Sequence, residues 1–217
     1  NKKMLDIKRT ATQKHGKDYI EALRDITHKD VTVIITAYNY ARYLEECVNS
    51  VLNQTILPEK IIIINDGSTD NTKEVLKQYH KNPLIDIINK KNEGVVKSKN
   101  LGISKANTHW TIFLDADDYL DKEYIEKHLK HANEGRFDVV YSDMRLFGAT
   151  NDIFRARSFS PYSLTHGNYI HNSALICTTL LKQSGGYKIE MKEGLEDWEL
   201  YLTLLEIGAN FSYIPEP

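Results

Sequence analysis

The sequence has few cysteines and no long apolar run, and each shortage argues against a class of protein. Its two cysteines, Cys47 and Cys177, cannot form a disulfide framework, and both lie among apolar residues, which favours a reducing compartment. No run of about eighteen apolar residues exists, which argues against a membrane-spanning segment. The first residues are too charged for a signal peptide, so we expect no export directed by this N-terminus.

The chain also lacks an excess of charge of either sign. Its 28 Lys and Arg side chains nearly balance 30 Asp and Glu side chains, which gives a formal net charge of −2. A general nucleic-acid-binding protein would show a basic excess, so the composition argues against nucleic acid as a partner. With 217 residues, the chain is long enough for one large domain around a single core.

Several common active-site motifs are missing. The segment TAYNYAR, which follows the first predicted strand, contains no glycine, so the dinucleotide-binding fingerprint is absent. The sequence has no GxxxxGK[ST] loop, no Ser-centred nucleophile elbow and no paired Cys/His spacing typical of zinc. If the protein binds a diphosphate, these absences favour a metal bridge over a cradle of backbone amides.

The sequence does contain a regular alternation of strand-like and helix-like segments. Continuous apolar and β-branched runs predict strands that are buried on both faces. The predicted strands are 31–36, 60–64, 84–89, 110–114 and 137–142. Helical patterns separate them, and in the one over 94–106 we expect Gly102 to permit close packing. Five alternations with short links are typical of βαβ units, so the predicted class is α/β with a mainly parallel sheet.

Two regions depart from this alternation. Residues 1–29 predict a surface helix or a linker that precedes a domain spanning 30–217. Residues 143–169 are polar and aromatic without a period, which predicts a mobile loop over a site. The chain stops at Pro217 without a polar tail, so we expect it to be part of a longer protein with further domains.

The C-terminal part predicts a strand over 169–177, a helix from Thr178 and a last helix after the segment EGLED. Gly208 is expected to end that last helix. Its buried face is expected to carry Trp198, Tyr201, Leu202 and Leu205.

The most informative stretch is WTIFLDADDYL, in which an apolar run ends in Asp115, Asp117 and Asp118. These carboxylates repel one another unless a cation or water lies among them. In an extended chain Asp115 and Asp117 point to the same side, so a strand end would offer two hard oxygen ligands to Mg²⁺ or Mn²⁺. The alternative is a solvated turn before the next helix, with Asp121 as its N-cap.

Polar motifs follow three of the predicted strands, namely AYN, NDGS and DADD. In open parallel sheets, ligands bind beyond the carboxyl ends of the strands. We therefore expect the three motifs to converge on one site.

Five segments together resemble the inverting family-2 glycosyltransferases, which have a GT-A fold. They are VTVIITAYNYARYLEECVNSVLNQT, IIIINDGSTDNT, NEGVVKSKNLGISKA, IFLDADDYL and GGYKIEMKEGLEDWELYL, and they occur in the order of the family. The resemblance implies a Rossmann-like, mainly parallel central sheet with flanking helices and an acceptor-side extension. It also implies a metal-dependent, inverting transfer of a sugar from a nucleotide donor, UDP-linked by preference, to an acceptor hydroxyl.

The resemblance also implies a nucleotide site. The residues that it assigns to this site are Thr36, Ala37, Tyr38, Asn39, Asp66, Gly67, Lys99, Asp115 and Ala116. Tyr38 would lie near the base, unless it only packs at the strand end. Asp66 would accept a hydrogen bond from the ring N–H of a uracil-like base. It could also form an Asx turn at the start of the next helix, and the two roles are compatible. Lys99 stands where the family usually has Arg, so it keeps the charge without the planar fork.

The resemblance assigns Mn²⁺ or Mg²⁺ to Asp117 and Asp115, and the catalytic base to Asp197 in LEDW. A base is needed because the acceptor hydroxyl must lose its proton as its oxygen attacks the anomeric carbon. Alternatively, an acidic residue at a helix start only interacts with the helix dipole. Glu196 and Trp198 are expected on the acceptor side, although Trp198 fits a buried helix face equally well. Thr203 replaces an Arg that is common in relatives.

The resemblance places the reaction in polysaccharide or glycoconjugate assembly, in the cytoplasm or peripherally at the inner face of the membrane. The acceptor would be a saccharide or a lipid-linked molecule. Two other functions remain open because fold does not fix function. A sugar nucleotidyltransferase would show a Gly-rich basic N-terminal loop, which the sequence lacks. A non-catalytic sugar-nucleotide-binding module is the other, although the intact DAD and ED motifs argue against it.

Overall fold

The computed structural model describes residues 30–191 and 194–217, so the predicted lead-in over 1–29 lies outside the described residues. Strands and helices alternate through the first half of the described chain, as predicted. In chain order the elements are β1 (Val31–Ala37), α3 (Ala41–Leu52), β2 (Lys60–Asp66), α4 (Thr72–Lys77), β3 (Ile85–Lys90), α5 (Val95–Lys105), β4 (Trp110–Asp115), α6 (Tyr124–Gly135), β5 (Val139–Ser142), β6 (Met144–Leu146), β7 (Asp152–Phe154), α7 (Pro161–His166), β8 (Leu175–Cys177), α8 (Thr178–Gln183), α9 (Glu196–Glu206) and β9 (Phe211–Ile214).

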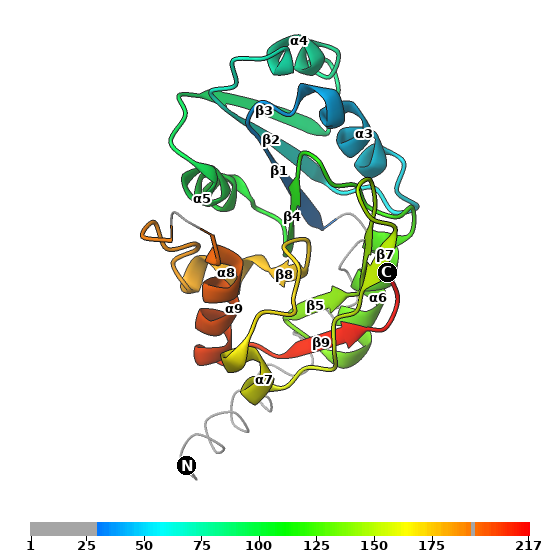
Figure 1. Cartoon of the computed structure of the whole chain (residues 1–217), viewed down its shortest axis with the longest axis vertical. Helices are drawn as coiled ribbons and strands as arrows, with labels where there is room; N and C mark the ends of the chain where they lie inside the picture. The colour runs from blue at the N-terminus through cyan, green and yellow to red at the C-terminus, as the bar shows by residue number, and fades with distance from the viewer. Residues whose placement is uncertain (1–29, 192–193) are drawn as a thin grey trace, which may run out of the picture.

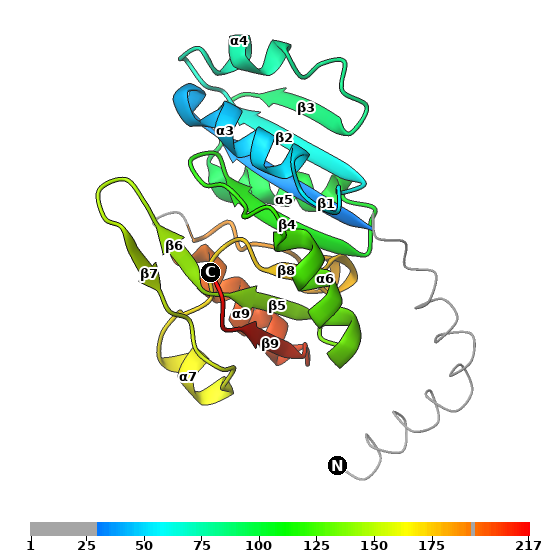
Figure 2. The same cartoon turned by 90° about the vertical axis from the view of Figure 1, so that its right-hand side faces the viewer.

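A seven-stranded sheet forms the centre of the molecule, with the strand order β3-β2-β1-β4-β8-β5-β9 (Figure 2). The strand pairs β3·β2, β2·β1, β1·β4 and β5·β9 are parallel. Strand β8 runs antiparallel to both of its neighbours, β4 and β5. The sheet is therefore mainly parallel, which confirms the predicted α/β class.

Helices cover both faces of the sheet (Figure 1), with α3 and α6 on one face and α5, α8 and α9 on the other. Successive residues of β1 alternate between the two layers: Ile35 packs in the layer of α3, and Ile34 in that of α5. Both side chains are completely buried. This two-sided burial explains why the strand is a continuous apolar run rather than an alternating one.

Helix α5 lies close to the sheet because Gly102 has no side chain. A Cβ atom at this position would lie 2.5 Å from the Cγ2 atom of Ile34 in β1. No real side chain tolerates such a contact, so one of the two elements would have to move. The predicted role of Gly102 in close packing is confirmed.

The segment 143–169, predicted as a loop, contains regular structure. Strands β6 and β7 form an antiparallel hairpin with each other, separate from the main sheet. Helix α7 follows, with Pro161 in its first turn and the Ser160 hydroxyl accepting a hydrogen bond from the Ser163 N–H. A Ser cap followed by Pro is a known helix start. The loop prediction was wrong because a local hairpin and a one-turn helix leave little apolar periodicity.

Four further details differ from the prediction. Only Leu175–Cys177 of the predicted strand 169–177 pairs in the sheet, and the short strand β9 was not predicted. Asp121 does not cap α6, because that helix starts at Tyr124 after Glu123. The residues of α9 that are fully buried are Leu200, Tyr201 and Leu204, whereas Trp198, Leu202 and Leu205 are only partly buried. No helix among the described residues is long and apolar enough to cross a membrane.

We expect the substitution Gly102→Ala to lower the free energy of unfolding by about 1–3 kcal/mol, the usual cost of overpacking a core. Alanine is ordinarily the better helix former by about 1 kcal/mol, so the expected sign is opposite to the intrinsic one. Urea denaturation measures the change. The control is Ser104→Ala, which is exposed on the same helix and should leave stability unchanged or raise it. A Gly102→Ala variant as stable as the parent would contradict the close packing.

Candidate functional site

The parallel register brings the three polar strand ends together. Thr36 near the end of β1 pairs with Asp115 at the end of β4, and its hydroxyl lies 3.4 Å from an oxygen of that carboxylate. On the other side, Ala37 at the end of β1 pairs with Asn65, directly before Asp66 at the end of β2. The motifs after these strands therefore lie side by side along one edge of the sheet, as expected.

A pocket of about 540 Å³ opens at this edge, and we call it the strand-end pocket. Most of the residues that the sequence pointed to line it. These are Thr36, Ala37, Tyr38, Asp66, Lys99, Asp115, Ala116, Asp117 and Glu196. The sequence analysis did not single out five other lining residues, which are Tyr40, Asn92, Gly94, Val95 and Ser98. Four of these belong to the segment NEGVVKS, whose Gly94 has a φ of +92° and immediately precedes α5.

Asn39 and Gly67 are not among the residues that line this pocket, and both support the loops beside it. The Asn39 N–H donates to the Ser68 hydroxyl (3.0 Å), and its side-chain oxygen accepts from the Thr69 N–H (2.8 Å). Asn39 therefore joins the loop after β1 to the loop after β2. Gly67 has a φ of +73°, and a Cβ there would lie 2.5 Å from the Asn92 nitrogen. A glycine is needed at this position because the loop after β2 passes close to the backbone of Asn92.

Asp66 holds the segment before α5 in place. Its carboxylate accepts hydrogen bonds from the Glu93 N–H (2.9 Å), the Gly94 N–H (2.8 Å) and the Lys90 ammonium (2.5 Å). The alternative in which Asp66 forms an Asx turn was wrong, because the neighbouring Asn65 accepts the Ser68 N–H instead. A carboxylate has about four lone-pair positions, so Asp66 can still accept one more donor from a ligand.

The carboxylates of the DADD segment are brought together by a turn. Strand β4 ends at Asp115, and the Asp118 N–H donates to the Asp115 carbonyl (3.0 Å). Asp115 and Asp117 therefore do not alternate along a strand, which corrects the predicted geometry, yet both line the pocket. Burial raises the pKa of Asp115. Burial, with the charges of Asp115 and Asp117, raises the pKa of Asp118 to about 6.

The donor set of this turn fits a hard divalent cation. Among the described residues, no group of three or more His, Cys, Asp or Glu side chains is arranged to hold a metal by itself. Mg²⁺ and Mn²⁺ are commonly bound by one or two carboxylates together with substrate phosphates and water. Asp115 and Asp117 supply that number, and the described ion pairs leave both without a basic partner within 4 Å. The residues present therefore fit a cation that arrives with a diphosphate.

Lys99 connects the strand-end pocket to α9. Its side chain is 1% exposed, and its ammonium lies 3.0 Å from Oε1 of Glu196 and 3.0 Å from Oδ1 of Asp197. The same ammonium lies 4.9 Å from the centre of the Tyr187 ring. Burial is the largest influence on the pKa of Lys99 and lowers it, but the charges of Asp197, Asp115 and Glu196 outweigh burial and raise it overall. Lys99 is therefore charged, and Asp197 lies at the same site as Asp115.

Asp197 is in the first turn of α9, in surroundings that suit a proton acceptor. Burial raises the pKa of its carboxyl, and the Glu196 charge acts in the same direction, while the Lys99 ammonium opposes both. A carboxylate with a raised pKa is a stronger base than one in water.

Trp198 points to a different place from the one expected. Its indole N–H donates to the Leu164 carbonyl of α7 (2.6 Å), and its ring packs on the core layer of α9. The hydrogen bond and the packing direct Trp198 toward α7. The alternative of a buried helix face describes it better.

The chain is similar to known proteins in sequence and in fold. A family model described as "Glycosyl transferase family 2" matches residues 32–198. The chain belongs to glycosyltransferase family 2. It is 33% identical over 184 residues to the chondroitin synthase of Pasteurella multocida (strain Pm70), over 82% of this chain and 19% of the synthase. The chain thus spans about a fifth of that relative's length.

Two solved structures have a similar fold. Residues 1–349 of S. aureus TarS in complex with UDP give a TM-score of 0.72 at 22% identity, over 86% of this chain and 58% of that one. The mannosyltransferase PcManGT from Pyrobaculum calidifontis, in complex with GDP-Man and Mn²⁺, gives 0.68 at 16% identity, over 95% and 64%. These similarities confirm the predicted GT-A fold of this family-2 chain.

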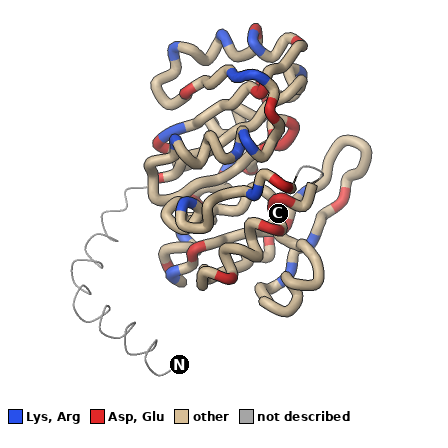
Figure 3. The backbone as a smooth tube through the Cα atoms, turned by 90° about the vertical axis from the view of Figure 1, so that its left-hand side faces the viewer, with Lys and Arg blue, Asp and Glu red and all other residues tan. Residues whose placement is uncertain are grey.

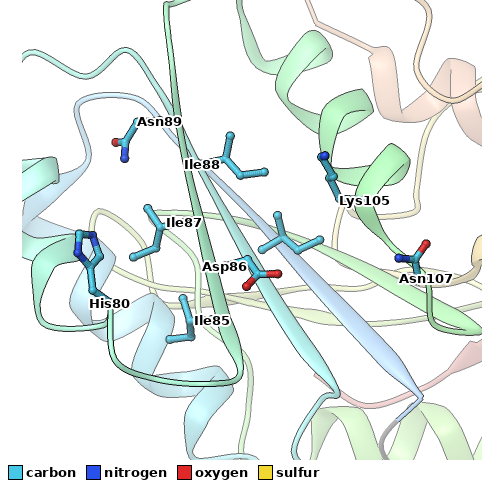
Figure 4. A pocket seen from close by; sticks show the side chains of 9 residues that line it. His80, Ile85, Asp86, Ile87, Ile88, Asn89, Lys105 and Asn107 are labelled. Carbon is cyan, nitrogen blue, oxygen red and sulfur yellow. The ribbon is translucent and has the colours of Figure 1, made fainter.

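A second hollow of about 690 Å³ lies on β3 and near the end of α5 (Figure 4). Asp86 in this hollow is paired with Lys60 (3.2 Å), and Lys105 comes from the last turn of α5. Its residues lie along the outer strand of the sheet and not beyond the carboxyl ends of the central strands. The chemistry expected of a family-2 enzyme is therefore assigned to the smaller strand-end pocket.

We expect Lys99→Met to lower the free energy of unfolding by about 3 kcal/mol at pH 7, because it leaves two partly buried carboxylates without their cation. The matched control is Lys97→Met on the same helix, whose Glu93 partner is 3.1 Å away and exposed. An exposed pair of this kind contributes at most about 1 kcal/mol. Urea denaturation of both variants measures the difference. Equal losses for the two would contradict the central role of the Lys99 pair.

Proposed function

We propose that this chain transfers a sugar from a UDP-linked donor to an acceptor hydroxyl, with inversion at the anomeric carbon. The observation that carries the proposal is a single site in which Lys99 joins Asp197 to the pocket lined by Asp115 and Asp117. A leaving diphosphate needs positive charge, and an attacking hydroxyl needs a base. The site gathers groups for both requirements.

The strand-end pocket would bind the nucleotide of the donor. Its volume of about 540 Å³ lies within the usual range of small-ligand sites, roughly 300–1,000 Å³. Tyr38 is 45% exposed at the pocket and would stack on a base, and Asp66 would accept a hydrogen bond from the ring N–H of uracil. The solved complex of TarS with UDP, a protein of the same fold, supports the choice of UDP.

Asp115 and Asp117 would hold Mn²⁺ or Mg²⁺ together with the diphosphate. The complex of PcManGT with Mn²⁺ supports such a cation. When bound, the cation would neutralise the charge that develops on the leaving diphosphate.

Asp197 would act as the general base. Its carboxylate would take the proton of the acceptor hydroxyl while that oxygen forms a bond to the anomeric carbon and the bond from this carbon to the diphosphate breaks. One base on the face opposite the leaving group gives a single displacement, and inversion follows. Glu196 would help to position the acceptor. The 33% identity to a chondroitin synthase supports a role in polysaccharide synthesis, with the acceptor a saccharide chain.

We expect Asp117→Asn to abolish the stabilisation of the protein by UDP with Mn²⁺. A ligand at about 100 times its dissociation constant stabilises a protein by about 2.7 kcal/mol, which thermal unfolding detects readily. The control is Asp121→Asn, an exposed carboxylate four residues further on, which should keep the full stabilisation. Retained Mn²⁺-dependent binding of UDP by Asp117→Asn would refute the assignment of Asp117 as a metal ligand.

We expect Asp197→Asn to reduce the transfer rate by about 10²–10⁴, the usual contribution of a general base. Stabilisation by UDP with Mn²⁺ should remain close to that of the parent chain. The control is Glu199→Gln, which removes another acidic side chain from the first turn of the same helix. If Glu199→Gln lost as much activity, or if Asp197→Asn kept its turnover, Asp197 would be only a helix-dipole residue.

A further inference from the structure

A third cavity, distinct from the strand-end pocket and from the hollow on β3, is lined by the later residues of the DADD turn. It has a volume of about 170 Å³, and we call it the hairpin pocket because the hairpin β6–β7 forms one wall. Asp118 and Tyr119 line it from the turn, Asp143 and Phe147 from the hairpin side, and His171 from the segment before β8. The backbone bond between Asp115 and Asp118 closes the turn between the two cavities.

Two exposed aromatic rings stand at the hairpin pocket. Tyr119 and Phe147 come from different segments, and their ring centres are 4.7 Å apart at an angle of 43°. Each residue keeps 42% of its surface exposed, although each is large and apolar. Exposed apolar surface that gathers at a cavity, rather than being scattered, marks a binding site. The rings offer flat apolar surface at the mouth of a polar cavity.

One carboxylate oxygen of Asp143, which lines this cavity, is buried and accepts no hydrogen bond from the described residues. The residue is 2% exposed, and its Oδ1 atom accepts from the Ala156 N–H (2.9 Å) and the Tyr213 hydroxyl (2.6 Å). No hydrogen-bond donor in the described residues reaches its Oδ2 atom. The guanidinium of Arg155 lies 3.7 Å from Oδ2, too far for a hydrogen bond, and that side chain is 73% exposed. A buried oxygen of this kind requires a donor, because leaving it unpaired is costly.

We propose that the hairpin pocket binds one sugar ring of the acceptor chain. A pyranose has an apolar C–H face that can lie on the Tyr119 and Phe147 rings, and hydroxyl groups that can donate to Oδ2 of Asp143. Consecutive residues of one turn line the two pockets, Asp115 to Asp117 the strand-end pocket and Asp118 to Asp121 the hairpin pocket, so the proposed acceptor site adjoins the proposed donor site. This inference rests on the proposed function and gives its acceptor a place.

Other ligand classes fit the hairpin pocket less well. A nucleotide needs more room, because the volume of about 170 Å³ is below the range of roughly 300–1,000 Å³ for drug-sized ligands. A purely apolar ligand would leave Oδ2 of Asp143 without a hydrogen-bond donor. A sugar ring offers both an apolar face for the Tyr119 and Phe147 side chains and hydroxyl donors for Oδ2 of Asp143.

The test measures saccharide binding without the donor. Saturation-transfer NMR is recorded on the full 217-residue chain with the methyl glycosides of glucose, galactose, N-acetylglucosamine and glucuronic acid. We expect at least one of them to bind, and its affinity to fall about tenfold or more in Tyr119→Ala and in Phe147→Ala. The matched control is Phe154→Ala, an exposed ring at 37% on the same hairpin that does not line the pocket. Thermal unfolding checks that each variant is folded.

The possible results separate this inference from the proposed function. Loss of binding in Tyr119→Ala and Phe147→Ala, with binding kept in Phe154→Ala, supports the saccharide site. No binding of any of the four glycosides, or equal binding in all variants, overturns it. Stabilisation by UDP with Mn²⁺, measured on the same samples, reports on the donor site alone. In a transfer assay, the acceptor KM should rise in Phe147→Ala while the donor KM stays unchanged.

Discussion

The ion pair network of Lys99 is the interaction on which the site depends. A charged ammonium that is 1% exposed is costly in free energy unless it is paired, and its partners, Glu196 and Asp197, lie almost a hundred residues further along the chain. Because α5 carries Lys99 and α9 carries both carboxylates, this pairing fixes the distance between the two helices. Gly102 in turn holds α5 against β1. The position of the proposed base, Asp197, therefore depends on how α5 packs against the sheet.

The same network balances the acidity of the site. Burial and the Glu196 charge raise the pKa of Asp197, and the Lys99 ammonium opposes both, so the pKa stays raised overall. Lys99 also lowers the pKa of Asp115, but burial, the largest influence there, raises it. One ammonium cannot neutralise the carboxylates on both sides of the pocket. The remaining negative charge near Asp115 and Asp117 suits a divalent cation (Figure 3 shows the distribution of charged residues along the chain).

The sequence predicted the parts of this site that come from strands and failed for those that come from tertiary contacts. The apolar runs that form β1, β2 and β4 can be recognised in the sequence, because burial on both faces requires apolar residues throughout the strand. Because these strands are parallel neighbours, their carboxyl ends lie at the same edge of the sheet. The pairing of Lys99 with Asp197 could not be predicted, since nothing in either segment specifies its partner. Short elements such as β9, and the hairpin that carries Phe147, were missed because three or four residues show no period.

The DADD turn divides the edge of the sheet into two compartments with different chemistry. The strand-end pocket gathers carboxylates around one buried ammonium, whereas the hairpin pocket presents two aromatic rings and one unpaired carboxylate oxygen. In a single displacement, the acceptor oxygen attacks the reacting carbon from the face opposite the leaving group. Two compartments that share one short wall would hold the two reactants without mixing their binding groups, and they would gain the rate advantage of proximity.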